Sequence, residues 1–472
     1  MDPLELDRET MRAMGHAAVD LLVDRISTLH DQPAWRGATR AEMDARVLEP
    51  PPEQPHDFTG LLRRLRGDVL AWGARVDHPR FFAFVPGSPT WPGILGEAIA
   101  AAHQAFAGTW LGGAGVAGLE LVVLEWFRQW LGLPQGASGL LLSGGSMANL
   151  TALAAARADR LGEDFADATL YFSSETHSSV ARACRVLGFR KERLRVVPAT
   201  RRATLPLDEL QRAIDADRAA GLRPFALIAN AGTTTAGAID ELAAAHRIAR
   251  ENGMWFHVDA AYGGFAILTE RGKRWLRGIE LADSVTLDPH KWLHQPFETG
   301  CLLVRDPATL IRAFRIMPDY LKDTEVAGAE VNFADRGIQL TRSARGLKIW
   351  LSLQYFGVAA FREAIDAALD HALAAQRYVE QSHALELLSP AQLGIVCFRR
   401  LAAGRSEAEL DELNGRVLSK LMRSGFAMVS STRVDGRLAL RLCILNHRSS
   451  REDVIGVLRW IEDCPAHDPS RG

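Results

Sequence analysis

The residue best placed for covalent chemistry in this 472-residue chain is Lys291, which stands beside His290 in the run DPHKW at residues 288–292. The run follows a short β-compatible segment, Ser284–Leu287, so the lysine is expected at the end of a strand. A lysine amine in such a place can form a Schiff base with an aldehyde when its pocket favours the neutral form. The alternative interpretation is a surface lysine in a salt bridge.

A second stretch has the composition of an anion-binding loop. Residues 143–149 are SGGSMAN, follow the apolar run Leu140–Leu142, and precede an Ala- and Leu-rich segment that predicts a helix to about Arg160. Small residues let the backbone approach an anion, and free N–H groups at a helix start receive it. The loop is neither a Walker A loop nor a GxGxxG fingerprint. It suits a phosphate group, with a plain helix N-cap as the alternative.

Two more side chains complete a candidate site. His177, in the run SSETHSS, is either a capping or core histidine or a ring that lies flat against a planar cofactor. Asp259 ends a predicted buried strand, where a lone carboxylate is costly unless it meets a positive partner such as a protonated ring nitrogen. Combined with the lysine and the phosphate loop, these residues predict a pyridoxal phosphate site.

Seven short apolar runs between about residues 139 and 304 predict the strands that position these side chains. The runs are Leu140–Leu142, Leu170–Phe172, Arg195–Val197, Phe225–Ala229, Trp255–Val258, Ser284–Leu287 and Leu302–Val304. Helical stretches separate most of them, which predicts an α/β fold with a mostly parallel seven-stranded sheet covered on both faces. Ligands in such sheets bind beyond the C-terminal ends of the strands, where the polar runs lie.

The N-terminal part of the chain predicts helices joined by Pro-rich loops. Apolar spacing predicts one helix between Met11 and Leu29 and a second from Thr59 to about Val76. These elements are too few for a core of their own, so we expect them to pack on a partner subunit. Further helices are expected at Ile94–Ala107 and Leu119–Leu131, with a Gly-rich connection at residues 112–115 between them.

The C-terminal part predicts a small α+β domain. It has Ala-rich helical stretches, the first from about Leu347, and strand-like runs at Leu393–Phe398, Phe426–Ser430 and Leu438–Ile444. The expected organisation is an N-terminal helical segment at residues 1–85, a large cofactor-binding domain at 86–345 and a small domain at 346–472. Arg342 and Arg345, at the boundary, could reach phosphate or a subunit interface, with salt bridging as the simpler expectation.

Composition excludes several classes of protein. The chain is 47% hydrophobic and 24% charged with a net charge of -2, which is typical of a soluble globular protein and gives no footprint for nucleic acid or an anionic membrane. Its five cysteines are widely spaced, which argues against a metal site or a disulfide framework and favours a reducing cytoplasm. We find no signal peptide and no apolar run of membrane-spanning length.

Nine motifs in order make the chain resemble the group II PLP-dependent decarboxylases, the family of aromatic L-amino-acid decarboxylase. The resemblance covers about residue 10 to about 460. Its motifs, between residues 78 and 448, are HPRFFAFVPGS, the glycine–serine loop with its helix, ETHSSVARA, AGTTTAGAID, WFHVDAAYGG, DPHKWLHQPFETGC, PDYLKD, RSARGLKIW and LRLCILNHR. The resemblance implies the PLP-dependent transferase fold (fold type I), pyridoxal 5′-phosphate as cofactor, and a homodimer with active sites shared between subunits.

The resemblance also implies roles for the matched residues. Lys291 would hold the cofactor covalently, Asp259 would keep its ring nitrogen protonated and His177 would stack on its ring. The further cofactor contacts would be Gly145, Ser146, Thr234, Ala261, Asp288 and His290. Tyr320, in PDYLKD, would be the tyrosine of the family's mobile catalytic loop and the proton donor at Cα. Family members with phenylalanine there tend to make aldehydes, so Tyr320 favours the amine as product.

Two positions depart from the animal members of that family. Asp288 stands where they carry asparagine, which adds a negative charge near the expected phosphate. The glycine-rich run at 112–115 lacks their Ser-Pro pair, which bears on the lining of the substrate pocket.

The expected activity is α-decarboxylation of an L-amino acid, most simply an aromatic one. The residues expected to line the substrate pocket are Phe81, Phe84, Pro86, Trp91, Trp110 and Thr234. For Phe81 and its neighbour Phe82, core packing is an equal alternative. Glutamate and sulfinate substrates are less favoured because no added arginine obviously selects a second carboxylate. The rival functions are an aldehyde synthase or aminotransferase of the same fold, and a non-catalytic binding protein.

Overall fold

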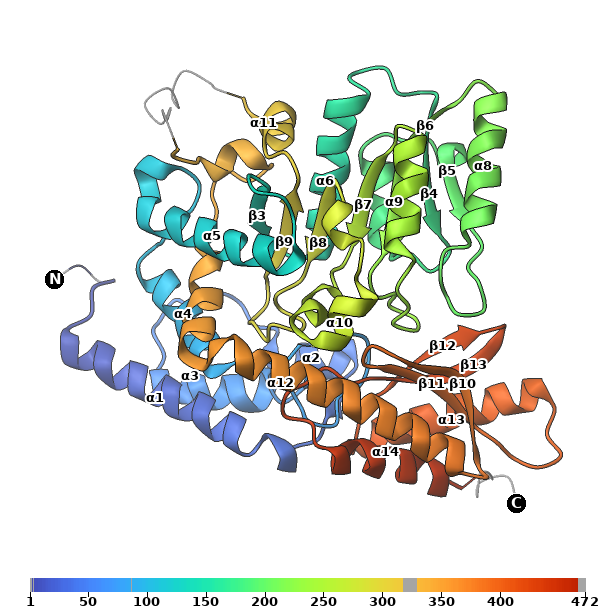
Figure 1. Cartoon of the computed structure of the whole chain (residues 1–472). Helices are drawn as coiled ribbons and strands as arrows, with labels where there is room; N and C mark the ends of the chain where they lie inside the picture. The colour runs from blue at the N-terminus through green and yellow to red at the C-terminus, as the bar shows by residue number, and fades with distance from the viewer. Residues whose placement is uncertain (1, 3, 86, 317–328, 466–472) are drawn as a thin grey trace.

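The computed structural model describes residues 2, 4–85, 87–316 and 329–465, and a seven-stranded sheet forms its centre (Figure 1). The strands are β3 (Ser138–Leu142), β4 (Ala168–Ser173), β5 (Leu194–Val197), β6 (Arg223–Asn230), β7 (Trp255–Asp259), β8 (Ser284–Leu287) and β9 (Gly300–Val304). Their order is β3-β9-β8-β7-β6-β4-β5, and β9 alone runs opposite to the rest. All seven predicted strands and the mostly parallel sheet are confirmed.

Helices cover both faces of this sheet because its strands are apolar on both sides. The helices of the large domain are α4 (Trp91–Ala102), α5 (Trp110–Leu131), α6 (Gly145–Arg160), α7 (Ser178–Val186), α8 (Leu207–Ala219), α9 (Leu242–Glu251), α10 (Glu270–Trp275) and α11 (Ala308–Phe314). In β4, Leu170 and Phe172 pack with α6 and α7, whereas Tyr171 reaches α8 on the other face. Figure 1 shows α9 and α6 on opposite sides of the strands.

The predicted glycine-rich connection at residues 112–115 is present only as a kink at Gly113, because the residues on either side of it belong to α5. Thr109 caps the helix by accepting from the Gly112 N–H, so the helix begins before the glycines. A Cβ on Gly113 would lie 2.0 Å from the carbonyl oxygen of Phe106, so the glycines permit close packing. A kink at Gly113, with φ -167° and ψ 51°, marks the place.

By length and composition, α5 is the one helix among the described residues that could cross a membrane, contrary to the expectation that no run is long enough. Its buried side chains Val123, Leu124 and Phe127 belong to the large-domain core. The same helix places Glu120 in a fully buried ion pair with Arg342, at 2.6 Å. These contacts are those of a core helix. Of the roles expected for Arg342, the structure shows the salt bridge.

The N-terminal segment contains α1 (Arg8–Ser27), α2 (Arg40–Val47), α3 (Phe58–Arg64) and the short strand pair β1 (Trp35–Arg36) and β2 (Gly73–Ala74). The predicted helix to Val76 is too long, since α3 ends at Arg64 and continues only as a π-helical turn to Val69. Gly73 then takes a φ of 110°, a conformation that suits glycine and does not continue a helix. The first helix is confirmed, and none of its 20 residues is buried.

The C-terminal part forms a second layer built on the long helix α12, which crosses the lower part of the molecule in Figure 1. Its elements are α12 (Arg345–Gln381), β10 (Leu385–Gln392), β11 (Ile395–Arg400), α13 (Glu407–Ser424), β12 (Ser430–Val434), β13 (Arg437–Cys443) and α14 (Arg451–Asp463). The four strands form an antiparallel sheet in the order β10-β11-β13-β12. The small α+β domain is thus present, and β10 is an addition to the prediction.

The predicted strand Phe426–Ser430 is wrong, because β12 begins only at Ser430. The preceding residues pair with the N-terminal segment instead. The Phe82 N–H donates to the Met428 carbonyl at 2.7 Å, and the Met428 N–H donates to Arg80 at 3.1 Å. The chain around residue 82 is therefore built into the small domain, with Phe82 in its core. The domain limits given above remain a prediction.

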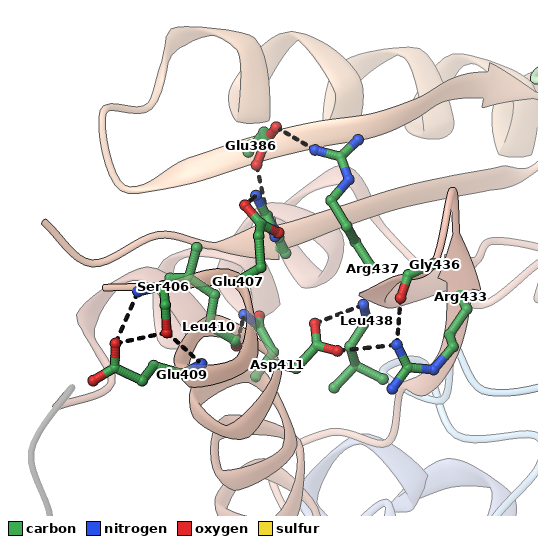
Figure 2. A network of polar contacts seen from close by, with 12 residues as sticks. Glu386, Ser406, Glu407, Glu409, Leu410, Asp411, Arg433, Gly436, Arg437 and Leu438 are labelled. Carbon is green, nitrogen blue, oxygen red and sulfur yellow. Dashed lines mark hydrogen bonds and ion pairs between the residues drawn. The ribbon is translucent and has the colours of Figure 1, made fainter. Parts of the chain in front are cut away.

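A polar network fixes the β12–β13 hairpin to α13 (Figure 2). Asp411 accepts from Arg433 at 3.0 Å and from the Leu438 N–H at 2.8 Å. The same figure shows Arg437 paired with Glu386 of β10, at 3.0 Å. The hairpin is held at its far end in this way, and its near end faces the site described next.

Candidate active site

A cavity of about 310 Å³ lies at the C-terminal ends of β3, β4, β6, β7 and β8. Polar side chains from the loops after these strands line it, as expected for a parallel sheet. The predicted residues that border it are Gly145, Ser146, His177, Thr234, Asp259, Ala261, Asp288, His290 and Lys291. The sheet topology thus brings together nine side chains or backbone positions that are up to 146 residues apart in sequence.

Lys291 lies in this cavity with its side chain 16% exposed, so it is not a surface lysine. Its Nζ is 2.9 Å from Oδ2 of Asp288, which is buried. His290 Nε2 is 3.6 Å from the same oxygen, which is longer than a hydrogen bond. Burial is the largest influence on His290 and lowers its pKa, so its ring is neutral at neutral pH. The lysine therefore has a single close counter-ion among the described residues.

The start of α6 forms an anion cradle. Gly144 is its N-cap and supplies no side-chain cap, which leaves the first N–H groups of the helix free to bind an anion. A Cβ on Gly145 would lie 2.9 Å from the Cβ of Ala261 and 3.0 Å from Oδ2 of Asp288, so only glycine leaves this space open. Ser146 adds a hydroxyl at the same helix start.

Asp259 is held by a network that sequence reasoning missed. Asn149 donates to Oδ2 of Asp259 at 2.8 Å and to the Ser179 hydroxyl at 3.0 Å. Its own oxygen accepts from Thr286 at 2.7 Å and from Nε2 of His257 at 3.0 Å. Asn149 is one helical turn after Gly145, so a polar residue on the apolar face of the predicted helix was the signal that could have revealed it.

His177 is the N-cap of α7 and its ring borders the cavity. Its Nδ1 is 2.8 Å from the Ser179 hydroxyl, which fixes the plane of the ring. Burial is the largest influence on this ring and lowers its pKa below the usual value. A neutral imidazole with an exposed face is therefore presented to whatever occupies the cavity.

A second cavity, of about 450 Å³, adjoins the first and shares Lys291, His177 and Thr234 with it. Phe84 stands on its rim with 64% of its surface exposed and with a φ of 56°, which a phenylalanine rarely adopts. Arg441 of β13 holds this backbone by donating to the Phe84 carbonyl at 2.6 Å. The predicted pocket residues Phe84 and Thr234 thus lie next to the lysine.

Arg441 is a site residue that sequence reasoning missed. It is 4% exposed, and it donates to the carbonyl of Thr235 at 3.0 Å and to the Ser430 hydroxyl at 3.2 Å. Its Nη2 has no hydrogen-bond partner in the described part of the chain, and no carboxylate there pairs with it. The signal was an arginine inside the apolar run of a predicted strand, LRLC.

Other predicted pocket residues do not border these cavities. Phe81 is 1% exposed and packs in a small core cluster with Ala83 and Met428, which corrects its expected place in the substrate pocket. Trp91 begins α4 and Trp110 begins α5, and Trp110 packs on the large-domain core. Neither tryptophan lines the space beside Lys291 in this chain. Pro86 and Tyr320 lie outside the described residues.

The first cavity fits pyridoxal phosphate. A phosphate needs an uncapped helix start with room for its oxygens, and the open space at Gly145 supplies it. A pyridine nitrogen needs a fixed carboxylate, which Asp259 supplies, and an aldehyde needs an amine shielded from bulk water, which the partly buried Lys291 supplies. In the described ranges no group of three His, Cys, Asp or Glu side chains could hold a metal ion. Fold and site thus define a pyridoxal phosphate enzyme.

Comparisons with known proteins agree with this definition. The model of the pyridoxal-dependent decarboxylase conserved domain matches residues 49–401. An aromatic-L-amino-acid decarboxylase of Bacillus atrophaeus is 40% identical, over 97% of this chain and 96% of its own length. A phenylacetaldehyde synthase of Arabidopsis thaliana is 32% identical, over 93% and 92%. The crystal structure of Oryza sativa TDC with PLP and tryptamine superposes with a TM-score of 0.92 and 30% identity, covering 98% of each chain.

The chain therefore belongs to the pyridoxal-dependent decarboxylase family. It is a PLP-dependent carboxy-lyase of fold type I, as the motifs in the sequence predicted. Its relatives include both decarboxylases and aldehyde synthases, so family membership alone leaves the substrate and the product open.

Proposed function

We propose that the enzyme removes the α-carboxylate of an aromatic L-amino acid and releases the amine and carbon dioxide. The observation that carries this proposal is the second cavity, which opens directly on Lys291 and is walled by Phe84 and Val85. An aromatic side chain fits against such a wall, and the reacting carbon then lies beside the amine. The 40% identity to an aromatic-L-amino-acid decarboxylase supports the same substrate class.

In this proposal Lys291 would hold the cofactor, Gly145 and Ser146 would hold its phosphate, and Asp259 would meet its ring nitrogen. When bound, the cofactor supplies an electron sink for the pair left at Cα when carbon dioxide leaves. The Asn149 amide and the Ala261 N–H, which lie 2.8 and 3.2 Å from the Asp259 carboxylate, keep it oriented toward the cavity. Such fixed groups stabilise developing charge without reorganising during the reaction.

Arg441 is placed to hold a substrate carboxylate. Arg441 borders the second cavity, carries a buried Nη2 without a partner among the described residues, and has no carboxylate paired with it there. Binding the α-carboxylate would orient every amino acid in the same way. The same arginine favours a second candidate, an acidic amino acid whose side-chain carboxylate it would hold. Arg441→Gln separates the two roles. If Arg441 binds the α-carboxylate, the variant should bind aromatic and acidic substrates more weakly, whereas if it binds a side-chain carboxylate, only acidic substrates should bind more weakly.

The covalent assignment is tested with Lys291→Ala. Borohydride reduction should fix the cofactor to the parent protein and not to this variant, and amine formation should fall to background. Lys273→Ala is the matched control, because Lys273 is an exposed lysine paired with Glu270. Cofactor that remains reducible onto the Lys291→Ala protein would show that another lysine is used.

We also propose a homodimer with shared active sites. The support is α1, in which no residue is buried. Its exposed side chains include four large apolar ones, Met11, Val19, Leu22 and Val23. A second subunit that covers this helix would bury them. Subunit exchange between Lys291→Ala, which forms no amine, and Tyr320→Phe, which forms little amine, should restore part of the amine formation if one subunit's Tyr320 serves the other's Lys291. Demonstrated exchange with no recovery would contradict a shared site.

A further inference from the structure

Asp288 is a carboxylate in an unusual place for an anion-binding site. Its side chain is 4% exposed, and Oδ1 has no hydrogen-bond partner among the described residues. Oδ2 is bound by Nζ of Lys291 at 2.9 Å. The same oxygen would lie 3.0 Å from a Cβ built on Gly145, so the carboxylate faces the first residue of α6. The carboxylate and the anion cradle therefore share one small space.

Two negative charges in that space oppose each other strongly. Carboxylate and phosphate oxygens a few ångströms apart, away from water, repel by an energy well above that in bulk solvent. The counter-ion that now balances Asp288 is the amine of Lys291, which the proposed function gives to the cofactor. In proteins, a carboxyl group placed beside another anion is kept neutral by a proton, and it then donates a hydrogen bond.

We propose that Asp288 takes up a proton when a phosphate group binds at the start of α6, so that affinity for the phosphate falls as pH rises. The neutral carboxyl donates to the phosphate through the oxygen that now has no partner or through the one released by Lys291. Asp288 thus does by protonation what an asparagine amide does at any pH, which makes cofactor retention sensitive to pH.

Other titratable groups around the cavity do not produce this effect. They are His177, Asp259, Tyr262, His290, Lys291 and Glu298, which line the cavity, and the buried Cys301, which pairs with Leu287 in the sheet. Burial lowers the pKa of both histidines and raises the pKa of the thiol, so these three groups are neutral near pH 7. Burial raises the pKa of the Tyr262 phenol, so it is neutral as well. The first turn of α6 carries only Gly145, Ser146 and Met147, none of which titrates. All of these groups are identical in an Asp288→Asn protein.

The test compares the parent chain with Asp288→Asn, each freed of cofactor and titrated between pH 6 and 9. The probes are pyridoxal 5′-phosphate and pyridoxal, whose binding is read from the absorbance of the bound cofactor. Inorganic phosphate is measured by its competition with pyridoxal 5′-phosphate. The parent Kd for pyridoxal phosphate should rise, relative to that of Asp288→Asn, by up to about tenfold per pH unit, since one proton is linked to binding. Pyridoxal has no phosphate, so the ratio of the two proteins' Kd values should stay flat.

Each outcome bears on the proposal. Parallel pH profiles of the two proteins for pyridoxal phosphate would overturn it, as would an equal slope for pyridoxal, because Lys291 chemistry would then explain the effect. Asp288→Ser removes the carboxylate in a second way and should reproduce the flattened profile. The inference rests on the phosphate placement in the proposed function. If the enzyme releases carbon dioxide but inorganic phosphate does not compete with pyridoxal 5′-phosphate, this inference alone is overturned. If the predicted pH profile is found but no carbon dioxide is released, the proposed activity alone is overturned.

Discussion

The side-chain amide of Asn149 lies 2.8 Å from the carboxylate of Asp259 and couples the phosphate cradle to the proposed ring-nitrogen site. Asn149 is on α6, one turn after the cradle begins, whereas Asp259 ends β7. Its oxygen accepts from Thr286 on β8, so three elements meet at one amide. The helix that would hold the phosphate thus also orients the carboxylate at the opposite end of the cofactor.

Asn149→Ala should weaken binding of the cofactor and shift its absorbance. The change removes the hydrogen bond to Asp259 and leaves the buried Thr286 hydroxyl without its acceptor, which costs about 1–3 kcal/mol. Asn414→Ala is the control, because Asn414 is also fully buried and hydrogen-bonded, but in the small domain. Both variants should lose stability, and only Asn149→Ala should change the cofactor spectrum. Equal spectra would contradict the coupling.

Breaking the buried ion pair of Arg342 and Glu120 should be strongly destabilising. Their side chains are 1% and 0% exposed, and Arg342 also donates to the carbonyls of Ala107 and Leu141 at 2.8 and 2.6 Å. Arg342→Met strands a buried carboxylate and should lower the free energy of unfolding in urea by about 3–5 kcal/mol. The double variant with Glu120→Gln should recover part of this loss. A loss below about 1 kcal/mol would show that the pair contributes little.

Acid should destabilise the fold through His78. Its Nε2 is 2.9 Å from the Gln32 carbonyl and its Nδ1 accepts from the Arg80 N–H, so the neutral ring satisfies both partners. Burial, followed by the positive charge of Arg80, lowers the pKa of His78 to about 4. The surrounding ionisable groups are Arg80, His30 and Asp453.

Because the folded pKa of His78 lies below the usual value near 6.5, the unfolded chain binds the proton first on acidification. The contribution of His78 to the free energy of unfolding should be unchanged above about pH 6.5, fall by at most about 1.4 kcal/mol per pH unit toward pH 4, and then level off. His257, whose pKa burial also lowers to about 4, adds to the same window. His78→Gln should flatten the profile, so an unchanged slope would remove His78 from this account.

Tyr320→Phe tests which product the enzyme makes. A phenol beside Cα delivers a proton after carbon dioxide leaves, whereas phenylalanine leaves the electron pair free to react with oxygen. The variant should form less amine and more aldehyde, hydrogen peroxide and ammonia, with cofactor still bound. Aldehyde synthases among the relatives make this a real alternative for the fold. Amine formed at the parental rate without aldehyde would refute the role.

The sequence was sufficient for features that depend on neighbouring residues. Each strand of the large sheet is a short apolar run followed by its polar loop, so the positions of Lys291, Asp259 and His177 at one sheet edge followed from parallel topology. Asp288 was also recognised as a charge near the expected phosphate. The prediction made from the glycine run in α5 was inaccurate because glycine can either break a helix or permit close contact. Only the Phe106 backbone beside Gly113 shows which of these two roles the glycines have.

What the sequence could not supply depends on contacts between distant segments. Phe81 seemed equally suited to a pocket or a core, and the partner that decides the question is Met428, almost 350 residues later. Arg441 becomes a site residue because β13 brings it to Phe84 and Thr235, which are both more than 200 residues earlier in the sequence. No local pattern specifies either contact. Arg441 was therefore absent from the predicted site although its strand was expected.

The most direct test of the central claim is a panel assay that reads carbon dioxide and amine in the same reaction. The purified enzyme with pyridoxal phosphate would be given tryptophan, tyrosine, phenylalanine, DOPA, glutamate and cysteine sulfinate. The account predicts carbon dioxide and the matching amine in equal amounts from one or more of the aromatic amino acids, and little from the acidic ones. Aldehyde with hydrogen peroxide in place of amine, or release confined to the acidic substrates, would contradict it.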